Sequence, residues 1–117
     1  MKRLYLATIN SWNGLRAAAR SDAAIREELA VILLAIPAAY FIAVSSARAI
    51  ELVLVLMLLL AVELLNTAIE KLADRLTLDH DEQIGRVKDM GSAAVGVALL
   101  IAGFTWIFAI VERLGFV

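Results

Sequence analysis

Four polar residues recur at helical spacing within an apolar part of the chain: Glu63, Asn66, Glu70 and Asp74. At about 100° per residue, these spacings place the four side chains on one helix stripe roughly 80° wide. Carboxylates inside a bilayer are costly and usually functional, and like charges stacked on one helix face repel one another. A divalent cation would relieve this repulsion, and ligands that are all oxygens favour Mg²⁺ or Mn²⁺.

The same stripe also fits other interpretations. Glu70 and Asp74 would serve as the solvated end of a helix, and Asn66 would suit a hydrogen bond between helices better than Glu63 does. An intramembrane Glu63 would also suit a small proton- or cation-coupled transporter subunit. Asp22 would either begin a helix as its cap or complete a metal site with Glu70.

A second polar segment, residues 77–90, separates two apolar runs. Arg86 and Lys88 follow Gly85 and could hold a phosphate group, although a basic residue beside an apolar run also sets membrane topology. His80, the single histidine, is more typical of a surface residue than of a ligand or base when taken alone. No GxxxxGK[ST] or GxGxxG motif is present, so a nucleotide site here would be unconventional.

Three long apolar runs must position these side chains: residues 29–47, 52–69 and 90–111. At about 1.5 Å per residue, each is long enough to cross a hydrocarbon core of about 30 Å. Residues 1–28 instead combine apolar residues at helical spacing with basic residues, which predicts an amphipathic helix at the membrane interface. We therefore expect an all-α integral membrane protein with three transmembrane helices, forming one membrane-embedded domain over residues 1–117.

The composition supports a membrane protein. Of the 117 residues, 62% are hydrophobic, whereas a soluble domain has about 45–50%. This excludes a disordered chain and argues against an ordinary soluble globule. The absence of cysteine excludes disulfide scaffolds and thiol catalysis, and the net charge of −1 gives no sign of a nucleic-acid partner.

The basic residues predict the orientation. Nine of the 11 Lys and Arg residues lie in the N-terminal arm or in the segment after the second apolar run, whereas Arg48 and Arg113 lie on the other side. The N-terminus is therefore expected in the cytoplasm and the C-terminus outside. Small residues four apart, such as Ser92 and Gly96, favour close helix contacts, and we expect a homo-oligomer.

Three motifs together resemble the prokaryotic diacylglycerol kinases: SWNGLRAA (residues 11–18), VELLNTAIEKLADR (62–75) and GRVKDMGSAAV (85–95). The resemblance covers nearly the whole chain. It implies a small lipid kinase of the bacterial inner membrane, with three transmembrane helices, an amphipathic N-terminal helix and a homotrimeric assembly. The implied reaction uses ATP and Mg²⁺ to phosphorylate 1,2-diacylglycerol to phosphatidic acid, with undecaprenol as the alternative acceptor.

The resemblance also implies a role for individual residues. Glu63 resembles the general base that engages the lipid hydroxyl, with Asn66 as its support, and Glu70 and Asp22 resemble the metal ligands. At Asp22 the family commonly has Glu, and at Asn10 we expect an aromatic residue. The implied ATP-binding residues are Arg3, Asn10, Asp22, Glu70, Asp79, His80, Asp81, Lys88 and Asp89. The implied lipid-binding residues are Ser11, Trp12, Arg16, Glu28, Glu63, Ser92 and Trp106.

Overall fold

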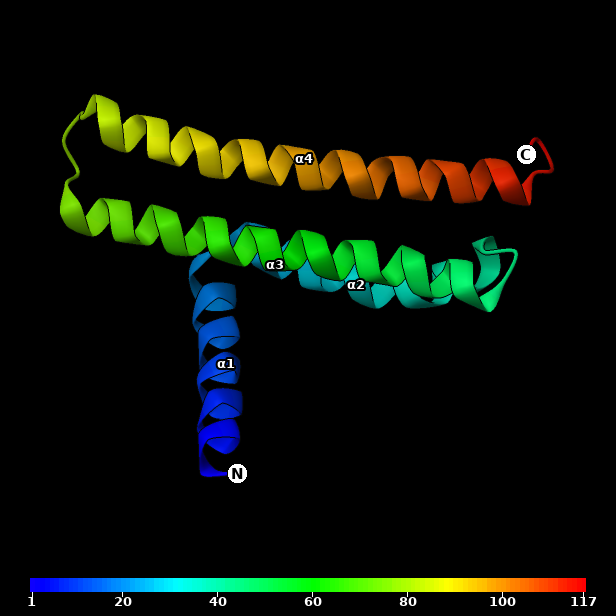
Figure 1. The fold of residues 1–117 in the computed structure, drawn as a ribbon, viewed down its shortest axis with the longest axis horizontal. Helices are drawn as coiled ribbons and strands as arrows, with labels where there is room; N and C mark the ends of the chain where they lie inside the picture. The colour runs from blue at the N-terminus through cyan, green and yellow to red at the C-terminus, as the bar shows by residue number, and fades with distance from the viewer.

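Four helices account for nearly all of residues 1–117, which the structure, a computed structural model, describes in full. They are α1 (Lys2–Ser21), α2 (Ala23–Ile42), α3 (Ser46–Leu76) and α4 (Glu82–Arg113). The expectation of an all-helical chain is confirmed, since no strand is present. Helix α3 packs against both α2 and α4, whereas α1 projects away from this bundle and carries the N-terminus at its free end (Figure 1).

Polar side chains decide where the helices begin. Asp22 ends α1 and caps α2, because its Oδ1 accepts a hydrogen bond from the backbone N–H of Ala24 at 2.9 Å. Ser45 and Asp81 cap α3 and α4 in the same way. Such side chains satisfy N–H groups that have no partner within the helix, which makes these residue types favourable caps.

Two predicted boundaries differ from the structure. The apolar run 29–47 is not one helix, because α2 ends at Ile42 and α3 begins at Ser46. Likewise, the predicted N-terminal arm 1–28 is divided at Asp22, and residues 23–28 belong to α2. The uncharged run 29–47 continues through the turn at Ser45, so at that turn only the capping residue reveals where one helix ends and the next begins.

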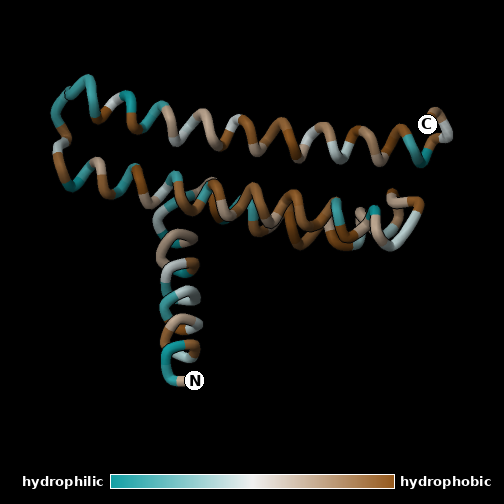
Figure 2. Tube along the Cα trace, in the orientation of Figure 1, coloured by the Kyte–Doolittle hydropathy of each residue, from teal (hydrophilic) through white to brown (hydrophobic).

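Helices α3 and α4 are long and apolar enough to cross a membrane. With 31 and 32 residues they are about 46–48 Å long, which exceeds a hydrocarbon core of about 30 Å. Hydrophilic residues gather at the turn that joins these helices and, in smaller number, at their opposite ends, with an apolar stretch between (Figure 2). Only 22% and 17% of their most apolar windows are buried, so most of this apolar surface is exposed in the single chain. Helix α2, which contains most of the first predicted span (29–47), carries the charged residues Arg26, Glu27 and Glu28 near its N-terminus.

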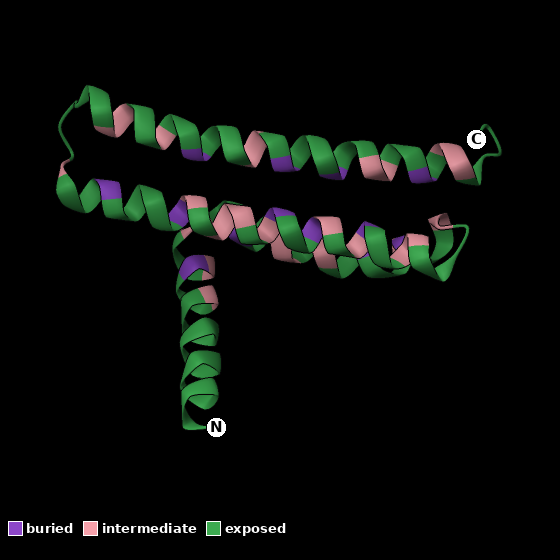
Figure 3. Cartoon of the chain, viewed as in Figure 1, coloured by how far each residue is buried: buried purple, intermediate pink, exposed green.

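Alanines bring the three bundle helices close together. Small side chains allow helix backbones to approach, which is the usual basis of packing between membrane helices. Trp106 packs beside both core clusters and donates a hydrogen bond from Nε1 to the backbone oxygen of Leu52 at 3.1 Å. The buried positions face neighbouring helices (Figure 3). One cluster consists of Ala35, Leu56 and Ala102, and the other of Ala39, Leu52 and Ala109.

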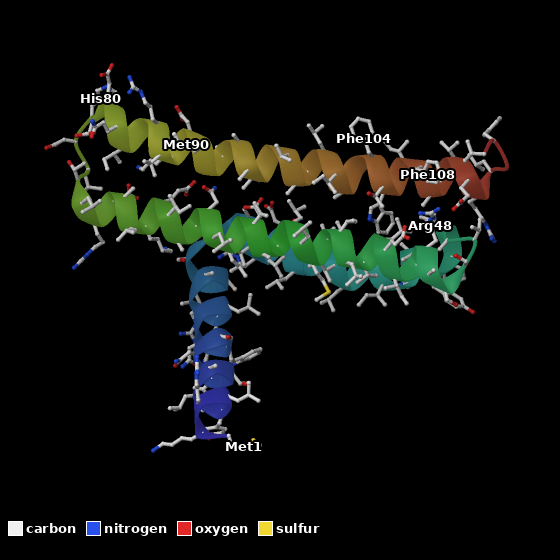
Figure 4. The ribbon with its side chains drawn as sticks, in the orientation of Figure 1. Met1, Arg48, His80, Met90, Phe104 and Phe108 are labelled. Carbon is white, nitrogen blue, oxygen red and sulfur yellow. The ribbon has the colours of Figure 1, made fainter.

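A charged cluster ties α3 to α4 at the end far from the turn that contains His80 (Figure 4). Arg48 Nε donates to Glu112 Oε1 at 2.9 Å, and Arg48 Nη1 donates to Glu51 Oε2 at 2.6 Å. The Arg48 guanidinium also lies 5.1 Å from the centre of the Phe108 ring. These contacts hold the two long helices in one register relative to each other.

Candidate active site

Carboxylates from two parts of the chain gather where α3 passes the junction between α1 and α2. On α3, Asn66 Nδ2 donates to Glu70 Oε1 at 3.1 Å, as their shared helix stripe predicts. Glu63 lies close enough to Glu70 and to Asp22 for their charges to interact. Glu28, on α2, is similarly close to Glu63. The fold therefore adds Asp22 and Glu28 to the acidic stripe of α3.

The four acids of this cluster form no ion pair, although Lys71 and Arg26 are close enough to Asp22 to act on its charge. The ion pairs of the chain are Arg48 with Glu51 and Glu112, and Lys88 with Asp74, so none involves Glu28, Glu63 or Glu70. Repulsion among carboxylates favours a bound cation, and these oxygen donors suit Mg²⁺. No three acids converge into a ready-made metal site, so a cation held by the predicted ligands Asp22 and Glu70 would need further oxygens from water or substrate.

Thr67 holds Asp22 in place. The Thr67 side chain is buried, and its Oγ1 donates to Asp22 Oδ2 at 2.7 Å. This hydrogen bond lowers the pKa of Asp22, with burial opposing the shift and the positive charges of Lys71 and Arg26 reinforcing it. Asp22 therefore stays ionised, as a cation ligand must. The sequence arguments missed Thr67, although it follows Asn66 within the motif of residues 62–75.

Two buried oxygens in this region have no hydrogen-bond partner, Asn66 Oδ1 and Glu28 Oε1. A buried polar atom without a partner costs about 1–3 kcal/mol, and native proteins contain few of them. Their presence beside Glu63 and Glu70 is typical of a site that a polar ligand completes.

An apolar cavity of about 550 Å³ lies between α2, α3 and α4. Glu28 is the only charged residue that lines it, and Trp106 lines it as well. Two of the seven predicted lipid-binding residues, Glu28 and Trp106, thus line one cavity from α2 and α4. An apolar cavity with one carboxylate suits an amphiphilic molecule with a hydroxyl group. Ser92, also predicted to bind lipid, does not line this cavity and is exposed on α4.

Lys88 lies against the far end of the acidic stripe. Its Nζ donates to Asp74 Oδ1 at 2.7 Å, and both side chains remain partly exposed. This contact gives Asp74, which the sequence left open as a mere helix end, a definite partner. It also places the predicted phosphate-binding cation on the same side of α3 as Glu70.

The other residues predicted to bind ATP, near the turn between α3 and α4, make no contact with the acidic cluster through a hydrogen bond or ion pair. Asp81 caps α4 through the backbone N–H of Ile84 at 3.0 Å, so its carboxylate already has a structural role. Asp79, His80 and Asp89 are exposed, and their side chains take part in no ion pair or hydrogen bond.

The predicted residues of α1 are mostly remote from the acids. Only the C-terminal end of α1 meets the other helices, so the N-terminal part of α1 lies away from them (Figure 1). Ser11 is the exception, since it lines a groove that Thr67 and Lys71 of α3 also line. No hydrogen bond or ion pair joins α2, α3 or α4 to the side chains of Arg3, Asn10, Trp12 and Arg16.

These features define an all-helical membrane protein with an acidic site beside an apolar cavity. The profile of the prokaryotic diacylglycerol kinases matches residues 9–110, and the chain belongs to this family. The resemblance predicted from the motifs is therefore confirmed.

Curated relatives extend over almost the same length. The diacylglycerol kinase of Escherichia coli K12 is 41% identical over 97% of this chain and 93% of its own. That of Pseudomonas aeruginosa is 41% identical over 91% and 86%, and that of Haemophilus influenzae 35% identical over 91% and 90%. Because the alignments span nearly the full length of both partners, the similarity concerns the whole fold and not one motif.

Proposed function

We propose that this chain is a diacylglycerol kinase, which transfers the γ-phosphoryl group of ATP to the free hydroxyl of 1,2-diacylglycerol. The products are phosphatidic acid and ADP. The observation that carries the proposal is the gathering of Asp22, Glu28, Glu63 and Glu70 beside an apolar cavity. Membership of the family and the names of the relatives support the same reaction.

Glu63 acts as the general base. The lipid hydroxyl oxygen attacks the γ-phosphorus, the bond from phosphorus to the ADP oxygen breaks, and the hydroxyl proton passes to the Glu63 carboxylate. Glu63 is free of ion pairs, so its carboxylate is available to accept this proton. Its neighbour Glu28 lines the cavity, which suits a lipid whose acyl chains lie there and whose hydroxyl reaches the acids.

Positioning and charge neutralisation provide most of the catalysis in phosphoryl transfer. Asp22 and Glu70 would hold Mg²⁺, which when bound supplies positive charge to the ATP phosphates. Mg²⁺ commonly binds one or two carboxylates together with phosphate oxygens and water, which matches a site without a third protein acid. Lys88 adds a second positive charge, and Asp74 orients it.

In this proposal α2 crosses the membrane as well as α3 and α4, and the protein resides in the bacterial inner membrane. The N-terminus and the turn after α3 face the cytoplasm, where ATP is available, and the C-terminus lies outside. The chain assembles as a homotrimer, which covers part of the exposed apolar surface. In the trimer, α1 of one copy would complete the acidic site of a neighbouring copy, since no hydrogen bond or ion pair joins Arg3, Asn10 or Trp12 to α2, α3 or α4 of their own chain.

The test is a phosphorylation assay with the purified chain in mixed micelles, Mg²⁺ and labelled ATP. Diacylglycerol and undecaprenol are offered side by side. Label in phosphatidic acid supports the proposal. Label only in undecaprenyl phosphate would retain the mechanism and overturn the acceptor, whereas no label in either lipid would refute the kinase and direct attention to ion transport.

A further inference from the structure

Gly91 on α4 lies directly against the side chain of Asn66 on α3. A Cβ atom built on Gly91 would overlap Asn66 Oδ1 and would lie 3.3 Å from Asn66 Cγ. Gly91 is also buried. The other α4 glycines differ, because a Cβ at Gly85, Gly96 or Gly103 would have no neighbour within 4 Å.

The space beside Gly91, and not its backbone, explains why a glycine suits this position. Gly115 is the only residue with a positive φ, so the backbone at Gly91, inside α4, would accept any residue except proline. A glycine inside a helix costs about 0.5–1 kcal/mol relative to alanine. At Gly91 this cost is offset because the missing Cβ leaves space for the Asn66 amide, which can then keep its hydrogen bond to Glu70.

We propose that Gly91 is a positioning residue, which acts by letting the Asn66 amide lie between α3 and α4. In this position Asn66 Nδ2 donates to Glu70 Oε1, while the buried Oδ1 faces Gly91. An alanine at position 91 turns the amide away and breaks its hydrogen bond to Glu70. The catalytic consequence rests on the function proposed above, whereas the contact itself does not.

If Gly91 only allowed α3 and α4 to pack closely, Gly91→Ala would affect stability differently. The atom that an added Cβ would meet is the end of a flexible side chain, which can rotate. Gly91→Ala should therefore leave the thermal unfolding midpoint nearly unchanged and should act on Asn66. If Gly91 served packing alone, alanine would instead lower the midpoint equally with or without the Asn66 amide.

The experiment compares Gly91→Ala, Asn66→Ala and the double variant in the 117-residue chain, with Gly96→Ala as the control on the same helix. We expect Gly91→Ala to lower kcat about tenfold or more, as loss of a hydrogen bond to a charged group implies, with little change in the KM for diacylglycerol. It should add no further loss to Asn66→Ala, and Gly96→Ala should match the wild type. A wild-type kcat for Gly91→Ala, or an equal further loss in the Asn66→Ala background, would overturn the proposal.

A second readout does not depend on activity. The side-chain amide ¹⁵N resonance of Asn66 should shift in Gly91→Ala and stay in place in Gly96→Ala. An unshifted resonance would refute the contact, even if the protein proved to have another function. If Gly91→Ala failed to fold, the double variant should fold, because removal of the Asn66 amide relieves the overlap. A double variant that also failed to fold would count against the proposal.

Discussion

Replacement of Thr67 by valine tests how the junction between α1 and α2 is held on α3. Thr67 Oγ1 donates to Asp22 Oδ2 at 2.7 Å, and valine keeps nearly the same shape without the hydroxyl. The cap that Asp22 Oδ1 provides to α2 does not involve Thr67 and should persist. Thr67→Val therefore frees one oxygen of Asp22 and leaves a valine in a buried position.

The expected magnitude follows from the kind of hydrogen bond. A hydrogen bond to a charged group contributes about 1.5–3 kcal/mol, and the partial exposure of Asp22 reduces this to about 1 kcal/mol. The free energy of unfolding should fall by about that amount. If Asp22 binds Mg²⁺ as proposed, a change of about 1 kcal/mol would also weaken the apparent Mg²⁺ affinity about fivefold.

The stabilisation that the Thr67–Asp22 hydrogen bond provides should depend on pH. The Thr67 hydrogen bond lowers the pKa of Asp22 below its ordinary value of 3.8, so its stabilisation is complete above that pH and is lost as the pH falls through the lower, folded-state pKa. Wild type and Thr67→Val should therefore differ at neutral pH and converge in acid.

Denaturant unfolding and Mg²⁺ titration of the kinase measure the two effects, and Thr67→Ser, which keeps the hydroxyl, is the matched control. The reasoning fails if Thr67→Val matches the wild type at neutral pH, or if Thr67→Ser loses as much as Thr67→Val.

Three further substitutions probe other parts of the molecule. Glu63→Gln should abolish phosphoryl transfer and leave MgATP binding intact, as measured by equilibrium binding, and wild-type turnover would exclude Glu63 as the base. Asp74→Asn should release Lys88 and raise the KM for ATP, whereas an unchanged KM would show that their contact at 2.7 Å does not orient Lys88. Arg48→Ala should lower the thermal unfolding midpoint without changing the KM for ATP, because Arg48 joins α3 to α4 about 22 Å along α3 from Glu63. A change in that KM with no loss of stability would contradict this role.

The sequence by itself determines the features that depend on local periodicity. Glu63, Asn66 and Glu70 share a helix face because residues three and four apart on any helix do so. The length of the apolar runs likewise predicts the long helices α3 and α4, and the motifs around Glu63 and Lys88 predict the family. Helix ends are less accessible, because hydrophobicity continues through the turn at Ser45.

Only the tertiary structure decides which helices meet and in what register. Thr67 and Asp22 are 45 residues apart, and Arg48 and Glu112 are 64 apart, so no local pattern links them. Similarly, Gly91 is one of six glycines in the chain, and its contact with Asn66 follows from how α4 lies against α3. The sequence therefore places each polar side chain along its own helix, and the packing between helices decides which of them form a site.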